Sequence, residues 1–403
     1  MSRPATAPRS AGPRHGTGAV VIGGDYQGLG IARSLGRNGV PVCVLDDERS
    51  IARASRHVQQ FVRVPDLRDV RSTVSELLAA GSRFGWDGWV LFPTRDETVC
   101  ALARHRDQLT TRFRVPTPGW TAVRSCWDKR ETYRLAEELG IAHPRSWVPR
   151  DPSDVAAIDG PGPYVVKPAI KEHFFYATGV KAWRADGPAD LTDVVRRAVA
   201  VAGAGEIIVQ ELVPGDGEQQ YSYCAFVKEG HALASMTVRR RRQHPSDFGR
   251  ASTYVETIHL PELERPSLRF LAAIDFYGLV ELEYKRDYRD GAFKLLDVNA
   301  RTWGYHSLGT AAGVDFPYLL YADQIGVPPP SEPKTAPAGV RWIRLATDLP
   351  NALRDVAAGR LNVRDYLRTL RGVDTEAVLS AGDPMPWFYE LALLPYLAVR
   401  RGL

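Results

Sequence analysis

The chain has 403 residues, of which 44% are apolar, and this length and composition predict a globular protein of two or three domains. Basic residues exceed acidic ones by only 52 to 47, which is not the charge pattern of a nucleic-acid-binding protein. The four cysteines lie far apart without a Cys-x-x-Cys pair, so they indicate neither a zinc site nor a disulfide framework and favour the reducing cytoplasm.

The two ends of the chain carry no membrane signal. Residues 1–18 are rich in Pro, Ala, Ser, Gly and Arg and lack the apolar segment of a signal peptide, so we expect a disordered tail. The most apolar tract, residues 387–399, contains Glu390 and Pro395. It is shorter than the roughly 20 residues that a helix needs to span a bilayer. We therefore expect no membrane span.

Residues 19–115 alternate between strand and helix patterns. Apolar strands are predicted at 19–24, 40–46 and 90–93, and a helix opens at Asp96 after the last of them. This alternation is typical of an α/β domain with a parallel sheet. We predict a Rossmann-like first domain.

The segment GGDYQGLG follows the first strand and invites a dinucleotide-binding interpretation, with Asp46 about where a ribose-binding acid would lie. Gly23 and Gly28 are too far apart for the G-x-G-x-x-G spacing, and Tyr26 and Gln27 crowd the turn. A Rossmann-like scaffold without a dinucleotide is therefore favoured over NAD binding.

Residues 125–140 predict a helix, with Ser125 and Asp128 spaced as a capping box and Gly140 as its C-terminal stop. Lys129 lies in the first turn, where a cation opposes the helix dipole. This position argues for an anionic partner, with an exposed surface lysine as the alternative.

Lys167 ends a short apolar strand at 163–168, a position where lysines are scarce. Residues 169–179 then suggest a mobile loop, followed by a return strand that carries Lys181. Such a flap could cover phosphates. No P-loop motif occurs, so a nucleotide would have to be held by another device.

The stretch 206–217 reads EIIVQELVPGDG, a buried strand that breaks at Pro214 and is interrupted by Glu211. A break of this kind exposes backbone groups that an adenine can use, and Glu218 lies just beyond it to accept ribose hydroxyls. An ordinary strand end with an exposed acid is the alternative.

Two further strands, at 221–227 and 232–242, end in the run of arginines 239–242. In an extended chain only alternate side chains share a face, so at most about two of these arginines can line one site. Arg240 and Arg242 are the candidates for binding an acidic substrate, because arginine binds carboxylates with two hydrogen bonds.

Residues 278–301 predict a hairpin of two apolar strands that carry acids. Asp297, Asn299 and Arg301 project from one face of the second strand, and Glu281 and Glu283 share a face of the first. Clustered carboxylates repel one another unless a cation neutralises them, and Mg²⁺ prefers such hard oxygen ligands. The hairpin therefore predicts a magnesium site, with a solvated acidic surface as the alternative.

The two acidic faces coincide only in one register. A three-residue loop, Arg289 to Gly291, would set Glu283 opposite Asp297 and would place Gly291 in the left-handed position that such loops need. A regular two-residue turn would place the Glu283 side chain on the opposite face of the hairpin from Asp297. We predict the three-residue loop, or at least a loop of odd length or a bulge.

In chain order these features resemble the ATP-grasp superfamily: Lys129, Lys167, the strand break at 211–213, Glu218, Glu283, Asp297, Asn299 and Arg301. Within it, RQHPSDFG at 242–249 and the LDVNART ending of the hairpin are most similar to the carboxylate-amine ligase branch that includes D-aspartate ligase. The resemblance implies an α/β protein, with residues 19–115 preceding an ATP-grasp domain at 116–327 that has mixed and antiparallel sheets. The expected subdomains are about 116–205 and 206–327, and residues 328–403 are expected to form a linker and a C-terminal extension.

The family also implies roles for individual residues. Phosphates would be held by Lys129 and Lys167, adenine by Glu211, Leu212 and Val213, the ribose by Glu218, and magnesium by Glu283, Asp297 and Asn299, with Lys167 and Arg301 beside the transferred phosphoryl group. Asp297 departs from the family, which more often has Glu at that position. The flap is also unusual, because His173, Phe174 and Phe175 replace glycines there.

The implied function is an ATP- and Mg²⁺-dependent ligase that joins an amino-acid-like carboxylate to an amine through an acylphosphate, with Mn²⁺ as the alternative metal. Its expected partners are small molecules, and a homodimer is the default assembly. A kinase on the same scaffold, a non-catalytic ATP-binding protein and an NAD oxidoreductase are the alternatives.

Overall fold

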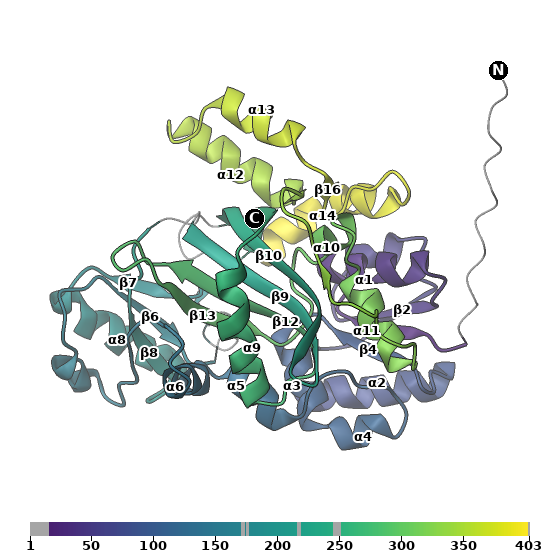
Figure 1. Cartoon of the computed structure of the whole chain (residues 1–403), viewed down its shortest axis with the longest axis horizontal. Coiled ribbons are helices and arrows are strands. Elements are labelled where there is room, and N and C mark those ends of the chain that lie inside the picture. Colours follow the sequence, from purple (N-terminus) through teal and green to yellow (C-terminus); the bar gives the residue numbers. More distant parts are fainter. Residues whose placement is uncertain (1–15, 171–173, 175–176, 216–218, 245–250, 402–403) are drawn as a thin grey trace.

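The computed structural model of the chain describes residues 16–401 except 171–173, 175–176, 216–218 and 245–250. Within these residues three sheets are surrounded by helices (Figure 1). One sheet lies in the N-terminal part, one small sheet lies at the opposite side, and the largest runs between them. The predicted mixed α/β class is confirmed.

The N-terminal sheet is parallel, with strand order β3-β2-β1-β4. Its strands are β1 (Ala19–Ile22), β2 (Val42–Asp46), β3 (Gln60–Arg63) and β4 (Val90–Pro93). The connecting segments form α1 (Tyr26–Arg37), the 3-10 helix η1 (Ile51–Ala54), α2 (Val70–Phe84), α3 (Asp96–Arg104) and α4 (Arg106–Thr110). β1, β2 and β4 are buried along their whole length, which is why they are apolar on both faces.

The glycine-rich turn after β1 is shorter than the sequence suggested, because α1 already begins at Tyr26. Asp46 is buried there, accepts a hydrogen bond from the Gly24 N–H at 2.7 Å and pairs with Arg95 at 2.8 Å. Its carboxylate therefore closes the turn and anchors β4, a structural use that argues against the dinucleotide interpretation.

The helix predicted at 125–140 is in fact two helices, α5 (Trp120–Trp127) and α6 (Lys129–Glu138). The capping box was placed wrongly. Ser125 lies inside α5, and Asp128, which has an extended backbone, is the N-cap of α6 and accepts from the Arg130 N–H. Lys129 is the first residue of α6, as expected.

The small sheet has the order β5-β8-β6-β7. Its strands are β5 (Ser146–Trp147), β6 (Tyr164–Pro168), β7 (Trp183–Ala185) and β8 (Ile207–Glu211), and it packs against the 3-10 helix η2 (Pro152–Ala157) and α8 (Pro188–Ala202). Lys181 lies in a bend before β7, so the expectation that the return strand carries it is wrong. Of the predicted flap, His173 and Phe175 lie outside the described residues, whereas Phe174 is fully buried against Trp183.

The large sheet has the order β13-β12-β9-β10-β11-β15-β16, with β14 beside β10. Its strands are β9 (Gln220–Lys228), β10 (His231–His244), β11 (Ala251–Ile258), β12 (Gly278–Arg286), β13 (Phe293–Asn299), β14 (Lys334–Thr335), β15 (Arg341–Ile343) and β16 (Thr375–Glu376). The associated helices are η4 (Pro261–Leu263), α9 (Glu264–Ala273), α10 (Ser307–Ala311), α11 (Phe316–Gln324), α12 (Leu345–Ala357), α13 (Val363–Arg371) and α14 (Met385–Arg401). The C-terminal segment, through β14, β15 and β16, thus adds strands to this sheet.

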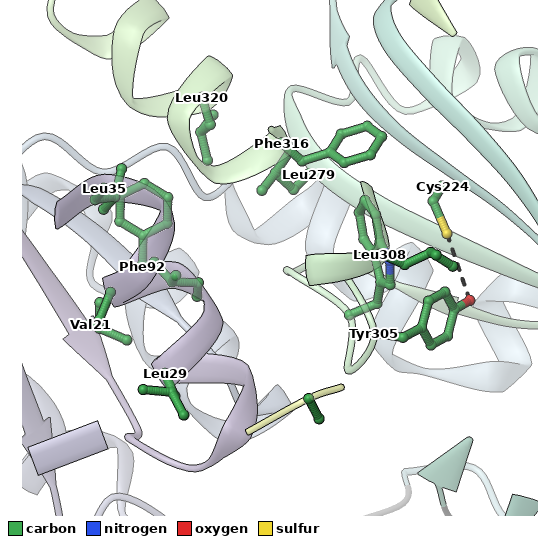
Figure 2. Packing of buried hydrophobic residues seen from close by; sticks show 14 of the residues in the cluster. Val21, Leu29, Leu35, Phe92, Cys224, Leu279, Tyr305, Leu308, Phe316 and Leu320 are labelled. Carbon is green, nitrogen blue, oxygen red and sulfur yellow. Dashed lines mark hydrogen bonds between the residues drawn. The ribbon is translucent and has the colours of Figure 1, made fainter. Parts of the chain in front are cut away.

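One apolar core joins the first domain to the large sheet (Figure 2). Val21 and Phe92 from the N-terminal sheet belong to the same buried cluster as Leu279 of β12 and Phe316 of α11. The Cys224 thiol on β9 lies next to the Tyr305 hydroxyl in that cluster. None of the helices in the described parts of the chain has the length and hydrophobicity needed to cross a bilayer.

Candidate active site

The β12–β13 hairpin adopts the register that was predicted for the acids. Glu281 lies opposite Asn299, and Glu283 lies opposite Asp297. The predicted three-residue loop is wrong, because six residues, 287–292, connect the strands. A bulge at Leu296 compensates for the even loop, since the pairing shifts by one residue after Glu283. Gly291 is left-handed, with φ +74°.

The two glutamates of β12 and Asn299 form one hydrogen-bonded group. The Asn299 side-chain amide donates to Glu281 at 3.1 Å and to Glu283 at 2.9 Å. Glu281 also accepts from the hydroxyls of Ser222, at 3.0 Å, and Tyr305. On the other side of Glu283, Arg240 of β10 donates to the second carboxylate oxygen at 3.1 Å.

Among the described residues, no lysine or arginine forms an ion pair with the buried Glu281 of this group. Burial, together with the nearby Glu283 charge, raises the pKa of Glu281 to about 7. Burial alone would lower the pKa of Arg240, but the Glu283 and Glu281 charges raise it. A further cation next to these carboxylates would therefore be stabilised.

Both predicted phosphate lysines point toward β13. Lys129 Nζ lies 2.5 Å from Asp297 Oδ1, and this charge outweighs the effect of burial and raises the lysine pKa. Lys167 Nζ donates to the Tyr133 hydroxyl at 2.7 Å, and that hydroxyl donates to the Leu296 carbonyl at 2.7 Å. Helix α6 and strand β6 thus bring both cations to the same end of the hairpin.

Arg301 stands just beyond β13, where the first domain meets the hairpin. Its Nε donates to Asp96 Oδ1 at 2.6 Å, and its Nη2 lies 3.3 Å from Asn299 Oδ1. A pocket between α3, α5 and the end of β13 is lined by Asp96, Lys129, Asp297 and Asn299 among others. Asp96 of α3 therefore fixes an arginine that faces the predicted metal ligands.

The two candidate substrate arginines do not share a face. β10 has a bulge at Arg241 in its pairing with β11, and this extra residue turns Arg242 away from Arg240. Arg242 instead forms two 2.8 Å hydrogen bonds to Asp348 of α12. Only Arg240 reaches the acids of the hairpin, so the shared placement predicted for this pair is wrong.

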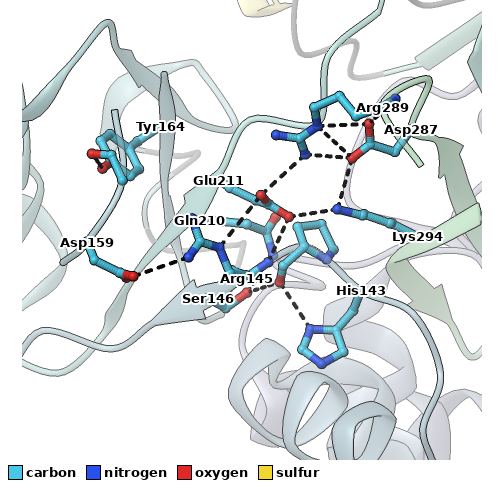
Figure 3. A network of polar contacts seen from close by, with 12 residues as sticks. His143, Arg145, Ser146, Asp159, Tyr164, Gln210, Glu211, Asp287, Arg289 and Lys294 are labelled. Atoms are coloured by element: carbon cyan, nitrogen blue, oxygen red, sulfur yellow. Dashed lines mark hydrogen bonds and ion pairs between the residues drawn. The ribbon is translucent and has the colours of Figure 1, made fainter. Parts of the chain in front are cut away.

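The predicted adenine hinge lies at the end of β8, where a dense ion-pair network surrounds Glu211 (Figure 3). Glu211 is 2.8 Å from Lys294 Nζ and 3.3 Å from Arg289 Nη2, and Asp287 lies 2.9 Å from the same lysine. The Leu212 N–H donates to the Pro163 carbonyl at 2.9 Å.

These contacts fasten the hinge strand to the β12–β13 hairpin, with Val213 buried just after them. Because the Glu211 carboxylate is held within this network, its contribution to a nucleotide pocket would come from its backbone and from the position it gives to Val213. Glu218 lies outside the described residues.

The chain was compared with protein families, curated proteins and solved structures. No family model matches the chain. A D-aspartate ligase from Enterococcus faecium is 22% identical over 324 residues, which cover 76% of this chain and 76% of that protein. An L-amino acid ligase structure from Bacillus licheniformis has a TM-score of 0.59 at 17% identity, over 79% of this chain and 76% of the other.

A third similar structure is the biotin carboxylase domain dimer of a 2-oxoglutarate carboxylase from Hydrogenobacter thermophilus, in complex with MgADP and bicarbonate. It has a TM-score of 0.62 at 12% identity, over 79% of this chain and 72% of the other. The chain has the ATP-grasp fold. The resemblance that the sequence suggested, to the carboxylate-amine ligase branch of this superfamily, is thereby confirmed.

The candidate site contains residues that the sequence analysis missed. Asp96 was interpreted only as the start of a helix, yet it holds Arg301. Tyr133 links Lys167 to β13, and Tyr305 covers Glu281. Glu281 could have been chosen, because it alternates with Glu283 and was expected on the same face. No local pattern marks Asp96, Tyr133 or Tyr305, since each reaches the site through tertiary packing.

The donor set fits a magnesium ion. Glu283 and Asp297 present hard oxygens at opposite positions of one sheet face, where Arg240 and Lys129 now neutralise them, and the Asn299 amide oxygen beside them accepts from Arg301. In the described parts of the chain, no three acids, histidines or cysteines gather closely enough to form a metal site by themselves. The predicted set thus depends on the Asn299 amide oxygen as its third ligand.

Proposed function

We propose that this protein is an ATP-dependent ligase that joins the carboxylate of an amino-acid-like substrate to an amine. The observation that carries the proposal is the convergence of Lys129, Arg240 and Arg301 on the acids and amide at one end of the β12–β13 hairpin. Phosphoryl transfer needs positioning and neutralisation of charge more than covalent help, and this arrangement provides both. The D-aspartate and L-amino acid ligases among the similar proteins support an amino-acid substrate.

The reaction would run in two steps. A carboxylate oxygen forms a bond to the γ-phosphorus of ATP as the bond to ADP breaks, which gives an acylphosphate. The amine then attacks the carbonyl carbon and loses a proton, and phosphate leaves with the electron pair of the broken C–O bond. Arg301, fixed by Asp96, lies where it would stabilise the charge of the transferred phosphoryl group.

The nucleotide and the metal would be held by the residues predicted from the family. Lys129 and Lys167 would bind phosphates, and residues 211–213 would bind adenine. Glu283, Asp297 and Asn299 would hold Mg²⁺, which when bound supplies charge neutralisation for the phosphates. The MgADP complex of the similar biotin carboxylase domain supports this assignment. That domain is a dimer. A homodimer, Mn²⁺ as a substitute metal and a cytoplasmic location stay predictions for this chain.

The test is to incubate the protein with ATP, Mg²⁺ and a panel of carboxylates, each with and without amines. We expect ADP and phosphate formation that depends on the carboxylate, and a condensed product by mass spectrometry when an amine is present. Hydroxylamine should trap the acylphosphate as a hydroxamate, which a kinase acting on a hydroxyl group would not yield. Phosphate release that is indifferent to every carboxylate would contradict the proposal.

A further inference from the structure

Arg344, which directly follows β15, is a buried arginine with an unused donor. The residue is only 5% exposed, its backbone N–H donates to the Thr253 carbonyl, and its Nη2 donates to Glu390 of α14 at 2.8 Å. Among the described residues, its Nη1 has no hydrogen-bond partner. A buried donor without a partner costs folding free energy, and a ligand that accepted its hydrogen bond would recover that cost.

The Arg344 guanidinium lies at the N-terminus of α1, at the glycine-rich turn whose role the ligase chemistry leaves open. It stands 4.2 Å above the Tyr26 ring, and its Nη2 is 3.9 Å from Asp25 Oδ1. Asp25 is the N-cap of α1, a helix of 12 residues, and its side chain is partly exposed. An arginine and an aspartate thus lie together where the helix dipole also favours an anion.

This end of α1 abuts the chain just after Arg301. Gln27 Nε2 donates to the Thr302 carbonyl at 3.3 Å. A Cβ built on Gly304 would lie only 2.6 Å from the Tyr26 hydroxyl, so only glycine allows this close approach. Arg344 and Asp25 are therefore next to the predicted site of phosphoryl transfer, on the side of the first domain.

A purely structural role would need no open donor, as Arg33 shows. Arg33 is equally buried and also binds an acid of the C-terminal segment, with Nε 2.9 Å from Asp383. Its Nη2 donates to two further oxygens, the carbonyls of Val378 and Asp383. No Arg33 nitrogen is among the buried, unpartnered atoms of the described residues, so Arg344 differs from it in having capacity for a ligand.

We propose that Arg344 and Asp25 hold the α-carboxylate and the α-ammonium group of an amino-acid substrate. A zwitterion matches a pair of opposite charges, and arginine suits a carboxylate. Because both α-groups are held, the group that reacts beside Arg301 is a carboxylate on the side chain of that amino acid. This inference rests on the proposed ligase function, because it assigns one of its two substrates.

The test compares acids that differ by one α-group, with hydroxylamine as the amine and hydroxamate as the readout. Aspartate, in both enantiomers, is compared with β-alanine, which lacks the α-carboxylate, and with succinate, which lacks the α-ammonium. Glutamate, γ-aminobutyrate and glutarate form a second such set. We expect the wild-type protein to prefer the amino acid of one set in kcat/KM by about tenfold or more over each analogue, as a charged hydrogen bond predicts.

The two variants should lose different halves of this preference. Arg344→Gln should remove the preference for the amino acid over the analogue without an α-carboxylate, and Asp25→Asn, which keeps an N-cap, should remove the preference over the analogue without an α-ammonium. The KM for ATP should stay the same in both. Arg33→Gln is the matched control, since it removes an equally buried arginine but should leave both preferences intact.

Thermal unfolding of each variant shows whether it is folded under the assay conditions, and Arg344→Lys provides a milder change should Arg344→Gln not fold. The lysine would keep the charge but not the arginine geometry, so Arg344→Lys should retain part of the preference. Unchanged preferences in folded Arg344 and Asp25 variants would overturn the inference while the ligase proposal stands. Absence of hydroxamate from wild-type protein with every carboxylate would overturn the ligase proposal, and this inference with it.

Discussion

The two ends of the β12–β13 hairpin carry similar residues and serve different purposes. At the loop end, Asp287 is bound by Arg289 at 2.5 Å and by Lys294 at 2.9 Å, and Lys294 also binds Glu211. At the other end, Glu283 pairs with Arg240 and Asp297 with Lys129, but among the described residues the buried Glu281 forms no ion pair and is held by Asn299, Ser222 and Tyr305. The loop end therefore pairs each of these acids with a cation, whereas the other end holds a buried glutamate with hydrogen bonds from neutral groups.

The pKa values of the acids show the same difference. Hydrogen bonds from Arg289 hold the pKa of Asp287 well below its usual value, with Lys294 adding to the effect. Burial raises the pKa of Glu281 to about 7 instead. An ion pair offsets the cost of burying its charges, whereas a buried carboxylate without one costs stability that a bound cation would recover. The loop end thus holds the hinge in place, and the other end is suited to a metal.

The largest effect is expected from Asn299→Ala. This change removes the third predicted metal ligand and the contact with Arg301, so ligase activity should fall by at least about a hundredfold. The free energy of unfolding should fall by about 1–2 kcal/mol, because the buried Glu281 and Glu283 each lose a hydrogen bond from the Asn299 amide. Steady-state ADP formation and urea unfolding measure the two quantities. A variant with normal activity would show that the end of the hairpin with Glu281 and Glu283 is not the metal site.

Lys294→Met is expected to lower the stability more than Asn299→Ala does and the activity less. The methionine keeps the side-chain volume but removes one of the two cations, Lys294 and Arg289, that Glu211 and Asp287 share, which should cost about 3 kcal/mol of unfolding free energy. We expect the KM for ATP to rise severalfold because the hinge loses its attachment. Urea unfolding and ATP titration provide the measurements. If Lys294→Met lowers kcat as much as Asn299→Ala does, the contrast between the two ends is wrong.

The pH dependence of the unfolding free energy should show how much the loop-end ion pairs of Asp287 stabilise the fold. The folded-state pKa of Asp287 is depressed, so its stabilisation is present above its ordinary pKa of about 4 and is lost as the pH falls through the folded value. Wild-type protein should exceed Asp287→Asn by about 2 kcal/mol at pH 7, and the difference should shrink below about pH 4.

Asp290→Asn is the control for that experiment. Asp290 belongs to the same loop but its side chain is 54% exposed and lies 3.9 Å from Lys294. Its replacement should change the unfolding free energy by less than about 0.5 kcal/mol at any pH. A pH-independent difference between wild-type protein and Asp287→Asn would show that the loop-end ion pairs do not provide the stability assigned to them.

The smallest effect is expected from Gly291→Ala. Gly291 has φ +74° and open space around its Cα, so alanine there meets backbone strain but no steric clash. The expected cost is about 1 kcal/mol of unfolding free energy, with unchanged activity. Loss of activity in a folded variant would mean that the loop controls the register of the acids, a role assigned here to the bulge at Leu296.

The features predicted correctly from the sequence depend on local periodicity. The alternation of the hairpin fixed which acids share a face, and the apolar strands of the first domain were recognisable because they are buried on both sides. The prediction of a single helix at 125–140 is wrong because Asp128 ends one helix and caps the next. Ser125 also fits a capping pattern, and the sequence analysis chose it as the cap. Two capping signals three residues apart cannot be ranked without the fold.

The features that were missed depend on irregularities and on distant contacts. The bulge at Arg241 separates Arg240 from Arg242, and a bulge leaves no mark in a run of four arginines. Asp96 meets Arg301 across 205 residues of sequence. Arg344 comes from a segment for which the sequence indicated no chemistry. The site residues that lie on the strands were therefore predictable from the sequence. The residues that reach the site from other domains, such as Asp96 and Arg344, were not.

The most direct test of the ligase account is to follow a labelled oxygen. The protein is incubated with ATP, Mg²⁺, an amine and a substrate whose reacting carboxylate carries a heavy oxygen isotope, and the released phosphate is analysed by mass spectrometry. An acylphosphate route predicts that one labelled carboxylate oxygen appears in the phosphate. Phosphate that acquires its new oxygen only from water would contradict the account.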